Sequence, residues 1–356
     1  MTRHLLNSRP PAYDRLILIP ALLLAMQLPV NASAMQQGNH ELDTTKVDPS
    51  SLMPPPRAVP LSLLRTGVAS VVAAPGEAYS AGGLHRFLFG DLNRDIWRIP
   101  FSVPVLRLDK VGGGLTVSEL SGGKQTLGLH FIGEDGLHYQ FRSMVKEPRR
   151  VLPKLLHKTP PGTVSKDQMA AQFPLAPMIV AELVEAVDVL VAKPRVVIMP
   201  DDERLGEYRD AFSGRMGWIE SRPQEREGDL PGFAGSTKIT GTEALYEELR
   251  ENPSSYVNAP ALLRARLIDF LVGDWDRHSD QWRWARFKDG ERMRWDPIPR
   301  DRDWAFCRID GVLRPFISFY YPQYEGFAGE YPNVERLAFA SMRVDRTLLE
   351  IGRAHV

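Results

Sequence analysis

The segment 267–306 constrains this chain most, because two acidic clusters there flank a predicted β-hairpin. The first cluster follows an apolar run ending at Gly273, and contains Asp274, Asp276, Arg277, His278, Asp280 and Gln281. A two-strand pattern turned by Asp289-Gly290 leads to the second cluster, Arg300, Asp301, Arg302 and Asp303. Carboxylates suit hard cations such as Mg²⁺ or Mn²⁺. The segment therefore predicts a site for a metal and a negatively charged ligand.

The spacing within these clusters is typical of phosphoryl transfer. That chemistry needs an aspartate that orients a hydroxyl, an amide oxygen five residues later for the metal, and a second metal-binding aspartate from another loop. Asp276 and Gln281 have the first spacing, and Asp301, with Asp303, can supply the second loop. A solvated acidic loop is the alternative interpretation.

Arg277 and His278 follow Asp276 directly. We expect them to brace the loop rather than to react. In the alternative interpretation, Arg277 and Arg302 are simply the ion-pair partners of the acidic residues.

A glycine-rich turn, Gly122-Gly123, lies between two predicted strands, and glycines let backbone N–H groups approach phosphates closely. Lys146 ends the next predicted strand, where a nucleotide-binding lysine is expected. Alternation in that strand places Gln140, Arg142, Met144 and Lys146 on one face. An ordinary hairpin turn and a surface lysine are the alternatives.

Such a lysine needs an acidic or amide partner on a nearby helix. The sequence offers Asp167, Gln168 and Glu182 and does not choose among them. The segment 216–220 predicts a strand leading into the connection between lobes, which makes Glu220 a candidate for binding the nucleotide. An ordinary buried strand is the alternative there.

The predicted elements follow the order β-rich segment, helix pair, two strands, then helices with an embedded hairpin, which favours an α+β protein of two lobes. We assign residues 79–220 to a β-rich N-lobe and 221–356 to a mainly helical C-lobe. The Pro-rich segment 35–78 predicts a linker or tether. The 44 basic and 44 acidic residues balance, so no global positive field predicts nucleic-acid binding.

Residues 1–34 have the pattern of a signal peptide, with basic residues, an apolar run and small residues ending at Ala34. We expect export to the periplasm or the medium, with an uncleaved leader that holds the protein at the envelope as the alternative. The single Cys307 cannot form a disulfide within the chain.

The motifs Gly273-Asp274-Trp275-Asp276-Arg277-His278, 281–284 and 297–303 resemble the atypical protein kinase-like group of the spore-coat kinase CotH, the HipA toxins and the secretory-pathway kinases. A family of exported bacterial proteins with the same GDWDRH…DQWRW…PIPRDRD module is more similar still. The resemblance implies a bilobal kinase-like fold, Asp276 as catalytic base, Asp301 as metal ligand and Lys146 on ATP phosphates. Gln281 departs from the asparagine common in kinases.

These observations predict an exported, metal-dependent phosphotransferase. It would move a phosphoryl group from ATP or another nucleoside triphosphate to a hydroxyl of an unidentified protein or small molecule. A pseudokinase that acts as a scaffold in the cell envelope, or a metal-dependent phosphohydrolase, are the alternatives.

Overall fold

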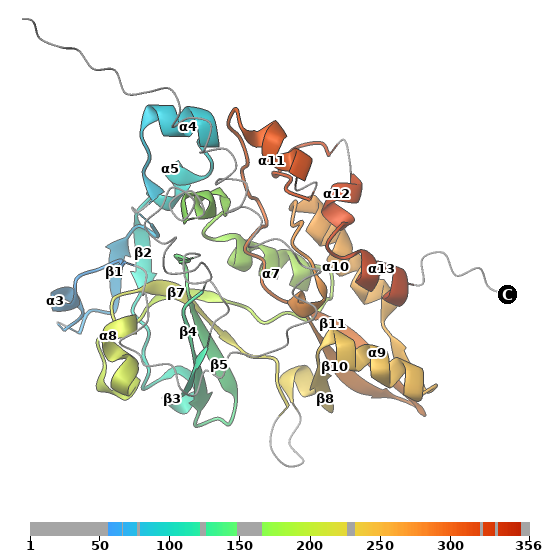
Figure 1. Ribbon diagram of the computed structural model, residues 1–356. Coiled ribbons are helices and arrows are strands. Elements are labelled where there is room, and N and C mark those ends of the chain that lie inside the picture. The colour runs from blue at the N-terminus through green and yellow to red at the C-terminus, as the bar shows by residue number, and fades with distance from the viewer. Residues whose placement is uncertain are drawn as a thin grey trace, which may run out of the picture.

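The computed structural model describes residues 56–65, 67–76, 79–121, 126–147, 166–225, 232–320, 323–331 and 334–349. Helices and strands are mixed in an α+β arrangement (Figure 1). The predicted leader and most of the predicted tether lie outside these residues, as does the Gly122-Gly123 turn. No helix of the described part is both long and apolar enough to cross a membrane.

A five-stranded antiparallel sheet forms the first half of the molecule, with strand order β3-β4-β5-β7-β6. Its strands are β3 (Leu115–Ser121), β4 (Gly128–Gly133), β5 (His138–Ser143), β6 (Arg195–Ile198) and β7 (Met216–Ser221). These strands agree closely with the predicted ones. The Gly-Gly turn lies between β3 and β4, and Lys146 follows β5 by three residues.

One face of this sheet is closed by an apolar cluster that includes Leu129, Phe131, Phe141, Val197 and Ile219. The 3₁₀ helix η8 (Glu203–Tyr208) and the short helix α8 (Arg209–Phe212) add Leu205 and Phe212 to that cluster. A further 3₁₀ turn, η4 (Val111–Gly113), precedes β3. Because side chains alternate along a strand, the residues next to Phe141 in β5 face the other half of the molecule.

A four-stranded sheet lies at the centre of the second half, with order β8-β10-β11-β9. Its strands are β8 (Lys238–Thr240), β9 (Ser255–Val257), β10 (Trp282–Asp289) and β11 (Arg292–Pro299). The predicted hairpin is β10–β11, turned at Gly290 with a φ of 59°. The predicted hairpin is present among the helices, and two three-residue strands, β8 and β9, extend it to four strands.

Helices α7 (Ala176–Ala186), α9 (Thr242–Glu251), α10 (Ala259–Leu271) and α13 (Met342–Leu348) accompany this sheet (Figure 1). They share a buried core with Trp282, Trp284 and Trp295 of the hairpin. Helix α10 begins at Asn258, whose side chain accepts a hydrogen bond from the Ala261 amide, as an N-cap does. It ends at Gly273, whose φ of 66° is the left-handed conformation common after a helix end.

The described part of the predicted linker is folded, which corrects the expectation of a tether through residue 78. Helix α3 (Leu61–Leu64) and strand β1 (Ser70–Ala73) contribute Leu64 and Val71 to a buried cluster. Strand β1 pairs with β2 (Phe101–Pro104), and helices α4 (Gly83–Phe89) and α5 (Arg94–Trp97) lie between them in the chain. The same cluster contains Trp275, Cys307, Ile309 and Leu337 from the second half.

The remaining elements are short. The 3₁₀ turns are η7 (Met169–Ala171), η9 (Phe233–Gly235) and η10 (Ser279–Gln281), and the helices are α11 (Arg314–Tyr320) and α12 (Val334–Ala338). Arg308 donates its amide to the Ala171 carbonyl at 3.0 Å, and the Asn93 side chain donates to the carbonyls of Ala171 and Phe306. These bonds join the segment before α7 to the chain after the hairpin.

Candidate active site

Three side-chain pairs connect strand β5 and the residues after it to the loop that follows β11. We call them the sheet–loop ladder, and they are Gln140–Arg300 at 2.9 Å, Arg142–Asp301 at 3.1 Å and Lys146–Asp303 at 2.5 Å. Each pair joins residues more than 150 positions apart in the sequence. The ladder brings the predicted nucleotide-binding strand and the predicted metal loop into direct contact.

The ladder follows from the alternation of β5. Phe141 is fully buried in the apolar cluster on one face, so Gln140 and Arg142 must point to the opposite face. Lys146 continues this face after the strand ends, and its side chain is only 10% exposed. Burial lowers the pKa of Lys146, but the charges of Asp303 and Asp301 outweigh burial and raise it, so the ammonium stays charged.

The loop carrying Asp276 is fixed at both ends. The Val272 carbonyl accepts a hydrogen bond from the Phe306 amide at 2.8 Å. This bond joins the Asp276 loop to the chain just after residues 300–303, the predicted metal loop. Arg277 is fully buried and donates to the carbonyls of Arg300, at 2.5 Å, and Gln281, at 3.3 Å. Its guanidinium also lies over the Trp282 ring. Arg277 therefore braces the loop, as predicted from the sequence.

The Asp276 carboxylate is partly buried and accepts no hydrogen bond from any residue that the structure describes. Burial raises its pKa, the charges of His278 and Lys146 lower it, and the charge of Asp301 raises it again. The net shift is upward. A carboxylate with a raised pKa and no fixed partner has the properties of a general base for a bound hydroxyl.

Asp301 and Asp303 differ in their protonation behaviour. Burial would raise the pKa of Asp301, but Arg142 and Lys146 hold it well below its usual range. Burial and the charge of Asp301 raise the pKa of Asp303. The backbone of Asp301 has a φ of 54°, a left-handed conformation that aspartate tolerates better than most residues. A strained backbone is common at functional sites, so this conformation and the buried charge make Asp301 a candidate functional residue.

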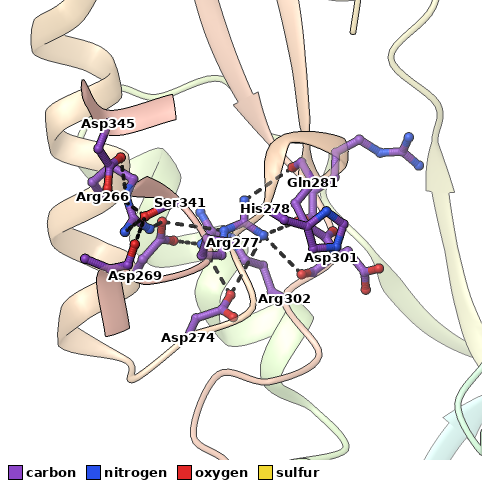
Figure 2. Close-up of polar contacts among 12 residues, drawn as sticks. Arg266, Asp269, Asp274, Arg277, His278, Gln281, Asp301, Arg302, Ser341 and Asp345 are labelled. Atoms are coloured by element: carbon purple, nitrogen blue, oxygen red, sulfur yellow. Dashed lines mark hydrogen bonds and ion pairs between the residues drawn. The ribbon is translucent and has the colours of Figure 1, made fainter. Parts of the chain in front are cut away.

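A fully buried ionic network lies directly behind the loop (Figure 2). Asp269 of α10 forms ion pairs with Arg266, Arg277 and Arg302, and its carbonyl accepts the Asp274 amide at 2.9 Å. The network thus connects the Asp276 loop and the metal loop to one carboxylate.

Two further groups extend this network. Arg266 contacts Asp345 at 2.9 Å and the Ser341 hydroxyl, which anchors α10 to the start of α13. Asp274 contacts Arg302 at 3.5 Å, and burial raises the pKa of Asp274 to about 7. Both contacts connect the two loops to the buried network.

The ability of these residues to hold a cation depends on the ladder. In the described residues no three His, Cys, Asp or Glu side chains are grouped as a metal site. The Oδ1 atoms of Asp301 and Asp303 are nevertheless buried without a hydrogen bond, although Arg142 lies 3.1 Å from the first. Gln281 is buried, and its Nε2 lies 3.2 Å from His278 Nε2. Carboxylate and amide oxygens are ligands that a hard cation accepts, but here Arg142 and Lys146 hold the two carboxylates.

Glu220 and Gln168 lie where the sequence placed them but make different contacts. Glu220 lies on β7, 4.0 Å from Arg300, and lines a cavity of about 20 Å³ with Arg142 and Asp301. A cavity of that size holds one water molecule, not a nucleobase. Gln168 accepts a hydrogen bond from Tyr324 at 3.3 Å and supports that ring from outside the ladder.

The expectation that Lys146 pairs with a helix residue is corrected. Asp167 pairs with Arg94 and His85, Gln168 with Tyr324, and Glu182 with Lys193. The partner is Asp303 of the metal loop. Arg142 was not among the predicted site residues, although the strand face that it shares with Lys146 was the signal that could have identified it.

Neither the family models nor the curated proteins gave a match to this chain. Among solved structures, the chain is similar to the proinflammatory kinase CtkA of Helicobacter pylori, with 10% identity and a TM-score of 0.28. That match covers 62% of this chain and 64% of the other, which is less than two thirds of its length.

A second similar structure is the Rio2 kinase–ADP/Mg²⁺–phosphoaspartate complex from Chaetomium thermophilum. Here the identity is 12% and the TM-score 0.29, and the match covers 79% of this chain and 74% of the other. Both TM-scores lie below 0.5, and the function is therefore derived from this chain's own residues.

Proposed function

We propose that this protein is an exported kinase-like phosphotransferase that moves a phosphoryl group from a nucleoside triphosphate to a hydroxyl acceptor. The supporting observation is the contact between the end of β5, which leads to Lys146, and the loop that carries Asp301 and Asp303. Lys146 contacts Asp303 at 2.5 Å, and the charges of both Lys146 and Asp301 act on Asp276. Phosphoryl transfer needs a cation, a base and a metal-binding carboxylate at one place.

In this proposal each group has one task. Asp276 accepts the proton of the incoming hydroxyl, which its raised pKa and free carboxylate favour. Lys146 positions the nucleotide phosphates. Asp301, Asp303 and Gln281 hold a Mg²⁺ or Mn²⁺ ion, which would neutralise charge on the phosphates. Gly122-Gly123, which come after β3 in the sequence, and Glu220 on β7 are further candidates for contact with the nucleotide.

The leader pattern of residues 1–34 supports the exported location, and the acceptor is then a protein or small molecule outside the cytoplasm. The balanced charge of the chain gives no support for a nucleic-acid acceptor.

The test measures phosphoryl transfer from γ-³²P-labelled ATP, with Mg²⁺ or Mn²⁺, to the protein itself and to cell-envelope fractions. Asp276→Asn serves as the inactive variant and Asp280→Asn as its matched control, because Asp280 is exposed and lies in the same loop. We expect transfer by the wild type and the control and none by Asp276→Asn. Equal transfer by all three would overturn the proposal.

A pseudokinase is the second candidate, and one observation favours it. Arg142 and Lys146 occupy the carboxylates that would hold the cation, and the cavity beside Glu220 has room for one water molecule. A scaffold would keep this closed arrangement. A rise in melting temperature with ADP and Mn²⁺, together with no ³²P transfer to any acceptor, would favour the pseudokinase over the enzyme.

A further inference from the structure

The sheet–loop ladder places positive side chains where a cation would bind. Arg142 Nη1 lies 3.1 Å from Asp301 Oδ1, and Lys146 Nζ lies 2.5 Å from Asp303 Oδ2. The other carboxylate oxygen of Asp303, Oδ1, is buried without a hydrogen bond, and Asp303 is 5% exposed. The two carboxylates therefore have capacity for a further positive partner but are already neutralised by the ladder.

We propose that Arg142 competes with the divalent cation for Asp301, and that it leaves Asp301 only when the phosphates of a nucleotide offer it a new partner. This inference rests on the proposed nucleotide-binding function. It makes Arg142 a positioning and specificity residue that couples two ligands. The protein then binds cation and nucleotide together, and each of them weakly alone.

The chemistry of the two partners supports the exchange. A guanidinium forms paired hydrogen bonds with phosphate as readily as with carboxylate, so Arg142 loses little when it moves from Asp301 to a phosphate. A cation that enters while Arg142 stays would lie beside a second positive charge, which is unfavourable in a largely buried site. If Arg142 moved to a phosphate before a cation arrived, the negative phosphates would lie beside unneutralised carboxylates and be repelled by them.

The geometry makes Arg142 better suited to this role than its neighbour. Arg300 is the next cation in the ladder, but its side chain contacts Gln140 at 2.9 Å and Glu220 at 4.0 Å. The charge of Arg142 lowers the pKa of Asp301 more than the charges of Lys146 and Arg300 do, and Asp301 in turn acts on Asp276. A change in the partners of Asp301 would therefore also change the electrostatic environment of Asp276, the proposed general base.

The experiment measures Mn²⁺ binding to the full chain by electron paramagnetic resonance, with and without ADP. The variants are Arg142→Met and the matched control Arg300→Met, which removes the same charge from the same ladder. We expect Arg142→Met to bind Mn²⁺ alone on the order of tenfold more tightly than the wild type. Arg300→Met should stay close to the wild type, and ADP should tighten Mn²⁺ binding in the wild type but less in Arg142→Met.

Unchanged Mn²⁺ affinity in Arg142→Met would overturn the inference, as would equal tightening by ADP in both proteins. If Arg142→Met does not fold, Arg142→Gln gives the same test, because it also removes the positive charge but keeps a polar side chain. If ADP and Mn²⁺ still strengthen each other's binding but no ³²P is transferred, the proposed phosphotransferase activity is contradicted and the inference about Arg142 is not. If ³²P is transferred but ADP does not tighten Mn²⁺ binding, only the inference about Arg142 is contradicted.

Discussion

Lys146 Nζ and Asp303 Oδ2 lie 2.5 Å apart, and both side chains are at least 90% buried. This pair joins the end of a strand in the first sheet to the loop after the second. Burial favours the neutral forms of both groups, and their mutual attraction keeps the lysine charged. The attraction between Lys146 and Asp303 therefore holds the two halves of the molecule together at this point.

Removal of Lys146 should destabilise the protein, because Asp303 is left buried without its partner. We expect Lys146→Met to lower the free energy of unfolding by about 3 kcal/mol or more. The double variant Lys146→Met with Asp303→Asn should lose clearly less than the sum of the single variants. Urea unfolding of all four proteins measures this, and additive losses would contradict a direct pair.

Asp276 should matter for activity and not for stability, because its carboxylate accepts no hydrogen bond from the described residues. We expect Asp276→Asn to shift the melting temperature by less than about 2 °C, because the amide matches the carboxylate in size and no hydrogen bond from the described residues is lost. Differential scanning calorimetry checks the value. A large fall in melting temperature would give Asp276 a structural role.

Asp269 should be among the most sensitive positions, since its buried carboxylate forms ion pairs with Arg266, Arg277 and Arg302. Asp269→Asn should lower the free energy of unfolding by about 3 kcal/mol or more. Glu243→Gln is the matched control, because it breaks an exposed pair with Arg343 and should change stability by at most about 1 kcal/mol. Similar losses in the two variants would contradict the role assigned to the network.

Asp274 should make stability depend on pH. Burial raises its pKa to about 7 in the folded protein, above the value of about 3.9 in an unfolded chain. The folded protein therefore holds a proton that the unfolded chain has lost between these values. Through this group, the free energy of unfolding falls as pH rises from about 4 to about 7, by up to about 1.4 kcal/mol per pH unit.

Asp274→Asn removes this contribution, so the variant should show a shallower fall over the same range. Urea unfolding at pH 5, 6, 7 and 8 tests the difference. Parallel pH profiles of the wild type and the variant would show that Asp274 does not carry the proton.

The local pattern of the sequence predicted much of this structure. Alternation and the Asp289-Gly290 turn gave the β10–β11 hairpin, and the apolar period gave α10. Strands β8 and β9 were missed because three residues carry too little alternation, and their pairing with the hairpin depends on neighbours distant in sequence. Proline content suggested a tether where Leu64 and Val71 are buried.

Some residues of the candidate site could likewise be predicted from the sequence, and others could not. Spacing alone made Asp276 and Asp301 candidates, because both lie in short motifs typical of phosphoryl transfer. The partner of Lys146 could not be found from spacing, since Asp303 is 157 residues away and competes with nearer acidic residues on the helix. Arg142 was visible as a face-mate of Lys146, but only the fold shows that the same face meets Asp301.

The buried cluster that contains Val59, Val71 and Trp97 together with Trp275, Cys307 and Leu337 has a consequence for how the molecule melts. Because residues from both ends of the described chain fill one core, neither half can lose its packing while the other keeps it. Calorimetry should therefore record a single cooperative transition. A ligand held at the ladder would then raise the melting point of the whole protein, and a fragment cut between the two sheets would not fold.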